Sequence, residues 1–207
     1  GSTLDLAVPD SLDGFAVTRV DLSECTNMKS LALTSFTVPD SVTSLNGDLS
    51  GMTSLKKAVL GDGIKALPGI MFSGCTSLTD VKLPSGIKSI PSGCFGATGL
   101  TDITIPDSVT YIGWAAFNQC KSLKSVDLGN GVSDLGWYVF NGCTALEKVT
   151  LGSNVDTIGY YCFADCPALS ELTFEGELPL VDASFTGITA TGYYPAAYAS
   201  QYANLPN

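Results

Sequence analysis

The feature that most constrains this chain is a repeat of 22 or 23 residues. Six leucines hold the same place in successive units: Leu55, Leu78, Leu100, Leu123, Leu146 and Leu169. Each unit has apolar residues three and five positions after its leucine, as at Val81 and Leu83, and closes on a phenylalanine such as Phe95. One unit is too short to bury its apolar side alone, so the units must stack on their neighbours. The repeat therefore predicts a solenoid.

The local structure of a unit follows from residue spacing. In LTDVKLP (78–84) apolar and polar residues alternate, which predicts a half-buried strand. Stacked units would align these strands into a parallel sheet with neighbours about 4.8 Å apart. Turn residues follow, as in PSGI (84–87), and SGIKSI (85–90) leaves room for a second short extended piece. The segment GWAAFNQC (113–120) is too short for a long helix and predicts one irregular or helical turn.

Seven cysteines follow the same period. Five precede the leucine, or its equivalent, by three residues (Cys25, Cys75, Cys120, Cys143 and Cys166), and Cys94 and Cys162 directly precede a phenylalanine. The chain has no His and no CxxC pair, so its thiols do not match a metal site. Cysteines stacked one unit apart keep their Cβ atoms near 4.8 Å, roughly 1 Å beyond disulfide geometry. We therefore predict seven buried, unpaired thiols that fill a narrow core.

The segment IPDSVTYIGWAAFNQCKSL (105–123) resembles the BspA-like leucine-rich repeat, and the resemblance extends over residues 25–187. It implies an α/β-type repeat solenoid, a right-handed horseshoe of about seven coils with a parallel sheet on its concave face, mostly β and loop with short helical turns. Relatives are bacterial surface or secreted proteins, often adhesins, so the resemblance implies a secreted or cell-surface location. Gly1 and Ser2 resemble a remnant of cloning, and a leader peptide removed before them would not be visible.

The two ends of the chain depart from the repeat and are interpreted as caps of a single domain, 1–207. Residues 1–24 read as a degenerate N-terminal coil, 25–187 as the repeats and 188–207 as a C-terminal cap. In that cap Pro195 suits a first helical position. The tyrosines Tyr194, Tyr198 and Tyr202 are four residues apart, which is typical of one helix face.

Composition excludes several classes of function. The net charge of −10 argues against nucleic acids and anionic membranes as partners, and no apolar run is long enough to cross a bilayer. Without His, the chain lacks Ser-His and Cys-His catalytic pairs, and no cofactor motif is present. We therefore expect a protein that is not an enzyme and binds neither metal nor cofactor. The sequence does not determine the oligomeric state, and a monomer is favoured.

An aromatic row is the leading candidate for a binding site. Trp114, Trp137 and Tyr160 occupy one position in three successive units, and Tyr138 and Tyr161 follow two of them. The equivalent residues in earlier units are Gly and Ser, so the fold itself does not require an aromatic side chain there. Aromatic residues are favoured at recognition surfaces. The alternative is a structural ladder of stacked rings that stiffens the coils.

The outward side chains of the expected concave sheet form a second candidate surface. It is polar and mixed in charge, and includes Asp80, Lys82, Asp102, Thr104, Asp127, Lys148 and Thr150. Together, the sequence and the resemblance suggest a non-catalytic binding or adhesion module that recognises a protein or a glycoconjugate. The alternative is a structural spacer within a larger surface protein.

Overall fold

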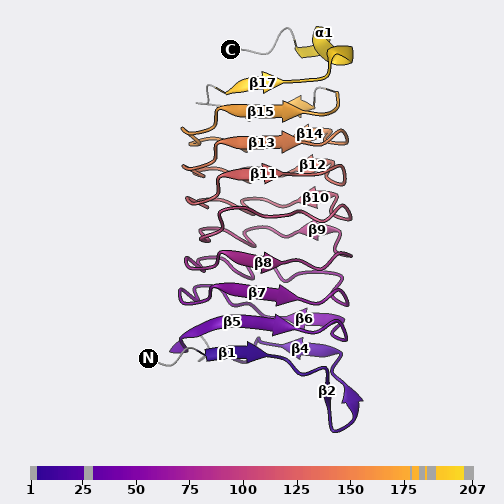
Figure 1. The fold of residues 1–207 in the computed structure, drawn as a ribbon, viewed down its shortest axis with the longest axis vertical. Coiled ribbons are helices and arrows are strands. Elements are labelled where there is room, and N and C mark those ends of the chain that lie inside the picture. The colour runs from indigo at the N-terminus through magenta and orange to yellow at the C-terminus, as the bar shows by residue number, and fades with distance from the viewer. Residues whose placement is uncertain (1–3, 26–29, 178, 182–184, 186–189, 203–207) are drawn as a thin grey trace.

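The computed structural model describes residues 4–25, 30–177, 179–181, 185 and 190–202. They form a parallel β-solenoid of about seven coils with little helix. The coils stack along one long axis, and the two termini lie at opposite ends of the stack (Figure 1). The predicted fold class, a repeat solenoid built on parallel strands, is confirmed.

The longer strands form a ladder along one face of the stack. Its first part contains β1 (Leu4–Ala7), β5 (Leu33–Val38), β7 (Lys57–Leu60) and β8 (Asp80–Lys82). Its second part contains β11 (Ser125–Asp127), β13 (Lys148–Leu151), β15 (Glu171–Phe174) and β17 (Thr191–Tyr193). All pairs in both parts are parallel, and the coil between them is joined to β11 by a single bridge, Thr104 to Asp127.

The second extended piece of each coil is also present, as a ladder of shorter strands. It contains β9 (Ser89–Ile90), β10 (Tyr111–Ile112), β12 (Asp134–Leu135), β14 (Thr157–Ile158) and β16 (Leu180–Val181), while β4 (Arg19–Asp21) pairs with β6 (Ser44–Asn46) nearer the N-terminus. The two kinds of strand run up the molecule as two columns (Figure 1). β9 is followed by Pro91, which lacks an N–H, whereas the N–H of Gly113 after β10 still donates to the carbonyl of Ile90 at 2.8 Å.

A third set of hydrogen bonds joins the coils at the turn that ends on the phenylalanine. The N–H of Phe95 donates to the carbonyl of Ala116 at 2.8 Å, and the N–H of Phe117 donates to that of Val139 at 2.9 Å. In every coil from residue 47 to 165 the residues two positions before and two positions after this phenylalanine, or its equivalent, have a left-handed backbone, and many of them are not glycine. The predicted irregular turn is thus a repeating structure that links each coil to the next.

The core is a continuous column of apolar side chains, and the turn phenylalanines form its centre. Successive rings of Phe72, Phe95, Phe117, Phe140, Phe163 and Phe185 stack with centroids 5.3–5.7 Å apart and interplanar angles of 18° or less. The first five of these side chains are completely buried. We call this set the phenylalanine ladder.

All seven cysteines are free, as predicted, and six are buried. Cys25 is exposed, so the expectation that all seven would be buried is wrong at that position. The reason is its location: it follows Leu22 at the N-terminal end, where the regular coil with its phenylalanine has not yet begun. Its repeat position is therefore not enclosed by neighbouring coils on both sides.

Irregular elements lie at the two ends of the stack. At the N-terminus a hairpin, β2 (Ser11–Leu12) with β3 (Phe15–Ala16), projects from the stack (Figure 1). At the C-terminus a short 3-10 helix, η2 (Ala196–Tyr198), leads into α1 (Ala199–Tyr202). Pro195 is the residue before η2, so Tyr194 precedes the helix instead of lying on its face. Tyr198 is half-buried and packs against the core.

Within the described ranges, no helix is both long and apolar enough to cross a membrane.

Candidate functional site

The aromatic row follows directly from the second ladder. β10, β12 and β14 are each followed by a glycine, and the aromatic residue comes directly after it: Trp114, Trp137 and Tyr160. All three glycines are required because the coils approach closely here, and a Cβ at Gly113 would lie 2.7 Å from the backbone nitrogen of Ser92. A Cβ at Gly136 would lie 2.9 Å from the backbone nitrogen of Trp114, and one at Gly159 would lie 2.6 Å from Cδ1 of Trp137.

The rings of the row are open to solvent. Trp114 and Trp137 are both 56% exposed and Tyr160 is 39% exposed. The rings of Trp137 and Tyr160 meet edge to face, with centroids 5.5 Å apart at 84°. Together with Gly136 and Gly159 they line a groove of about 640 Å³. We call it the aromatic groove.

Tyr111, Asp134 and Thr157 also line the aromatic groove and are adjacent in the registers of β10, β12 and β14; we call them its second rim. Asp134 accepts hydrogen bonds from the hydroxyl of Ser133 at 2.5 Å and from that of Thr157 at 2.6 Å. These two bonds, the one from Ser133 first, lower the pKa of Asp134 below its usual value. The groove therefore has an aromatic rim and a rim that carries a fixed carboxylate.

Sequence reasoning missed this second rim. Tyr111, Asp134 and Thr157 recur at intervals of 23 residues, and each lies three positions before an aromatic residue of the row. That spacing was available in the sequence. The three residues differ in type, however, so they do not stand out as a repeated chemical feature.

Tyr138 and Tyr161 are not part of the aromatic groove lining. Both have a left-handed backbone, with φ of 60° and 54°, and their rings stack on each other at 5.4 Å and 18°. Tyr161 also lies 6.5 Å from the ring of Tyr160. The structure thus brings three of the five predicted aromatic residues together around the groove and places the other two in a separate stacked pair.

The alternative candidate is the outward face of the ladder of longer strands, which we call the long-strand face. Ion pairs within the chain neutralise much of the charge on this face. Lys57 pairs with Asp80 at 2.7 Å, Lys82 with Asp62 at 3.7 Å and Lys148 with Glu171 at 3.0 Å. Asp102 accepts a hydrogen bond from the hydroxyl of Thr101, and Asp127 from the N–H of Gly129.

Thr104 and Thr150 lie beside these charges on the same face, where each aligns with Asp127 in the register. The seven predicted residues therefore share one surface. It is a polar face, and most of its lysines are paired with acidic residues of the chain.

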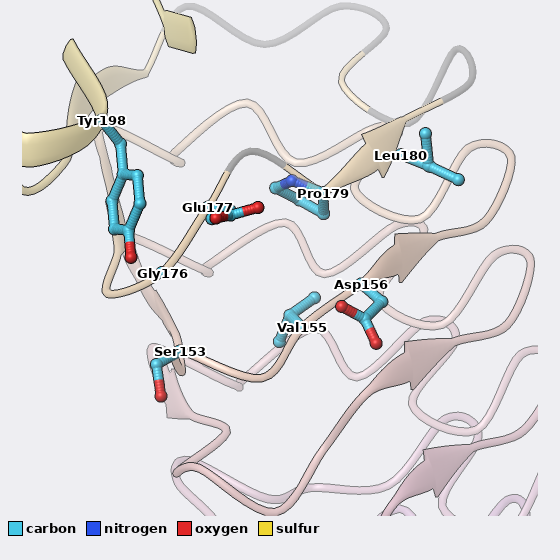
Figure 2. Close-up of a pocket in the computed structure, with 8 residues that line it drawn as sticks. All are labelled: Ser153, Val155, Asp156, Gly176, Glu177, Pro179, Leu180 and Tyr198. Carbon is cyan, nitrogen blue, oxygen red and sulfur yellow. The ribbon is translucent and has the colours of Figure 1, made fainter.

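A second hollow, of about 460 Å³, lies between the last coils and the C-terminal cap. Tyr198 closes one side and Asp156 and Leu180 lie on the other, with Glu177 between them (Figure 2). It forms where the cap meets the end of the solenoid. The carboxylates of Asp156 and Glu177 and the hydroxyl of Ser153 line it.

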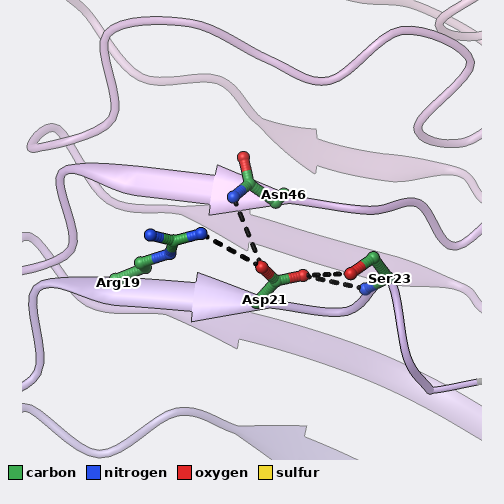
Figure 3. Close-up of polar contacts among 4 residues, drawn as sticks. All are labelled: Arg19, Asp21, Ser23 and Asn46. Atoms are coloured by element: carbon green, nitrogen blue, oxygen red, sulfur yellow. Dashed lines mark hydrogen bonds and ion pairs between the residues drawn. The ribbon is translucent and has the colours of Figure 1, made fainter.

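A polar cluster at the N-terminal end has a structural role. Asp21 accepts hydrogen bonds from the hydroxyl and N–H of Ser23, from the amide of Asn46 and from the guanidinium of Arg19 (Figure 3). These bonds, led by the one from the Ser23 hydroxyl, lower the pKa of Asp21 to about 2. The cluster ties the end of β4 to β6, so it stabilises the first coil.

The buried thiols are poorly suited to nucleophilic chemistry. Burial raises the pKa of Cys94, Cys120, Cys143 and Cys162, and it raises that of Cys166 to about 11. A thiol that stays protonated at neutral pH is a weak nucleophile and a weak metal ligand. Among the residues described, no group of three His, Cys, Asp or Glu side chains is placed to hold a metal ion.

Comparison with known proteins gives a consistent picture. A family model described as the BspA type leucine rich repeat region matches in six copies, over residues 22–121 and 88–188. Among solved structures, a leucine-rich repeat protein of T. pallidum is 24% identical, with a TM-score of 0.68 over 100% of this chain and 85% of that one. A leucine-rich repeat protein from Eubacterium ventriosum ATCC 27560 is 21% identical, with a TM-score of 0.50 over 75% of this chain and 52% of that one. No curated protein matches the sequence.

Proposed function

This chain belongs to the BspA-type leucine-rich repeat family, and we propose that it is a non-catalytic binding or adhesion module of a secreted or cell-surface bacterial protein. The observation that carries the proposal is the aromatic groove. Two tryptophans, each more than half exposed, lie on a rigid scaffold at a position where other coils of the same chain have Gly or Ser. Exposed, preorganised aromatic side chains are the typical anchors of a recognition surface.

Its partner in this proposal is a protein or a glycoconjugate, bound by a single domain with a cap at each end. Binding to a rigid repeat surface costs little conformational entropy, because the groove is already formed. The absence of His from the sequence and the raised pKa values of the interior thiols support a non-catalytic role.

The second candidate, a structural spacer, is favoured by one observation. Trp137 touches both Tyr160 and the Gly159 position of the following coil, so the row also contributes contacts between coils. An aromatic pair of this kind contributes about 0.5–1.5 kcal/mol. The two roles are separated by measuring binding and stability on the same variants.

The test is a binding screen against immobilised matrix proteins and glycans, with the wild type and a Trp114→Ser/Trp137→Ser variant. We expect the double variant to lose binding and to keep a wild-type circular dichroism spectrum, because Gly69 and Ser92 already occupy this position in other coils. The matched control is Asp102→Asn/Asp127→Asn on the long-strand face, which should bind normally.

Two results would contradict the proposal. Binding that survives in the tryptophan variant but disappears in the Asp102→Asn/Asp127→Asn control would move the site to the long-strand face. A wild type that binds nothing in the screen, together with a marked loss of stability in the tryptophan variant, would favour the spacer.

A further inference from the structure

Resting on the proposed binding function, we infer that the aromatic groove takes a basic peptide segment of a protein partner, with Arg or Lys side chains over Trp114 and Trp137 and against the carboxylate of Asp134. Three observations carry this inference. They are the charge of the half of the chain that builds the groove, the exposure of the rings, and the single carboxylate in the groove lining, which two hydrogen bonds fix.

Charge is distributed unevenly along the solenoid. Residues 101–207 contain 11 of the 20 acidic residues but only three of the ten Lys and Arg residues, which gives this half a net charge of −8. Residues 1–100 have a net charge of only −2. All residues that line the aromatic groove come from the acidic half, and none of them is Lys or Arg. A surface of this kind attracts cationic partners and repels anionic ones.

The aromatic rim suits a cation. A Lys ammonium or an Arg guanidinium is attracted to the face of an aromatic ring, and tryptophan is the most effective ring. Both tryptophans of the chain are in the groove, and each is 56% exposed. They belong to successive coils of the same stack, so an extended segment running along the solenoid axis would meet them one after the other.

Asp134 supplies the opposite charge. Its two oxygens each accept one hydrogen bond within the chain, from Ser133 and Thr157, which fixes the carboxylate in place. A carboxylate offers about four lone-pair sites, so two remain for a guanidinium or an ammonium group. The side chain is held before a ligand arrives, and little entropy is lost on binding.

A neutral sugar chain could use the rings and hydroxyl groups of the groove. It would gain nothing from the net charge of −8, however, and it would not need a carboxylate in the groove lining. Charge complementarity therefore favours a basic peptide, and the two ligands differ in an easily measured property. Binding of a basic peptide weakens as salt is added, whereas binding of a neutral glycan changes little.

The experiment compares a hexa-arginine peptide with a hexa-citrulline peptide, which has nearly the same shape but no charge. Tryptophan fluorescence is the readout, because both Trp residues line the groove. We expect saturable fluorescence change with the arginine peptide at low salt and at least tenfold weaker binding of the citrulline peptide. Asp134→Asn should weaken arginine binding about fivefold, whereas Asp102→Asn, which removes the same charge from the long-strand face, should leave it within about twofold of the wild type.

Calorimetry on a Trp114→Ser/Trp137→Ser variant with a wild-type melting temperature should show at least a tenfold loss. If that variant is unstable, Trp114→Phe/Trp137→Phe takes its place, since it keeps two rings and should lose affinity only partly. Equal binding of the two peptides, or equal effects of the Asp134→Asn and Asp102→Asn changes, would overturn the inference. A neutral oligosaccharide that binds through the tryptophans while hexa-arginine does not would also overturn it, but would leave the proposed binding function intact.

Discussion

At the scale of single residues, the interior cysteines show how a small side chain serves the stack. In four coils the thiol donates to a backbone carbonyl of the preceding coil: Cys75 to Leu49, Cys120 to Phe95, Cys143 to Phe117 and Cys166 to Phe140, at 3.0–3.2 Å. Leu49 occupies the phenylalanine position of its coil, so the contact is the same each time. The cysteine therefore fills a narrow space and contributes a weak hydrogen bond between coils.

This arrangement gives a prediction for thiol chemistry. A thiol-reactive disulfide reagent added to native protein at neutral pH should label Cys25 rapidly and the six buried cysteines only on unfolding, because burial both shields these six thiols and raises the pKa of most of them. The absorbance of the chromophore that the reagent releases gives the number of thiols that have reacted. In the Cys25→Ser variant no thiol should react in the fast phase. A second fast thiol in the native state would show that a coil opens or that a thiol is misplaced.

The left-handed backbone of the turn residues could not be predicted from the sequence. Ile70 has φ of 51° and Tyr138 has φ of 60°, although neither residue type favours that region. In the sequence, only the glycines at the equivalent position of other coils, such as Gly93, indicate a left-handed backbone. The hydrogen bonds from these residues to the next coil, such as the N–H of Tyr138 to the carbonyl of Tyr160, hold the conformation that local preference opposes.

At the scale of elements, the phenylalanine ladder is the feature most open to test. We expect Phe117→Ala to reduce the free energy of unfolding by about 3–5 kcal/mol, because it removes a fully buried ring from the middle of the stack. Urea denaturation measures the change. The matched control is Phe117→Leu, which should cost less because Leu49 already occupies the same position in the coil before Phe72. A loss below about 1 kcal/mol for the alanine variant would mean that the ladder does not hold the coils together.

The strands could be predicted because a half-buried strand alternates apolar and polar residues in the sequence. Val81 and Leu83 alternate with polar residues, and the first of the two strands of the coil lies there. Trp114 and Trp137 could be singled out because the same chain offers Gly69 and Ser92 for comparison. Asp134 was not, because its role comes from Thr157 on the neighbouring strand, and pairing between coils is set by the stack and not by local sequence.

At the scale of the whole molecule, the stack is one continuous core with different ends. The N-terminal end is held by β1 on β5 and by the Asp21 cluster, and the C-terminal end by β17 on β15 and by Tyr198. We propose that these segments act as the caps of a single domain, since a terminal coil without a cover would expose apolar side chains to water. The acidic half of the chain, residues 101–207, and the aromatic groove lie toward the C-terminal end of the stack.

The three sets of hydrogen bonds between coils have a mechanical consequence. They lie along the solenoid axis, so a load applied to the two ends pulls each coil away from its neighbour, one junction at a time, as in opening a zipper. A released coil of about 23 residues extends by about 75 Å, because an extended chain spans about 3.3–3.6 Å per residue whereas a stacked coil occupies only about 5 Å. When the molecule is stretched in an optical trap, we expect its length to increase in a series of steps of about that size, beginning at one end of the stack. A single large step would contradict this prediction. A protein of this design would lengthen gradually under tension, as a shock-absorbing tether does, while the coils still folded keep their surfaces intact.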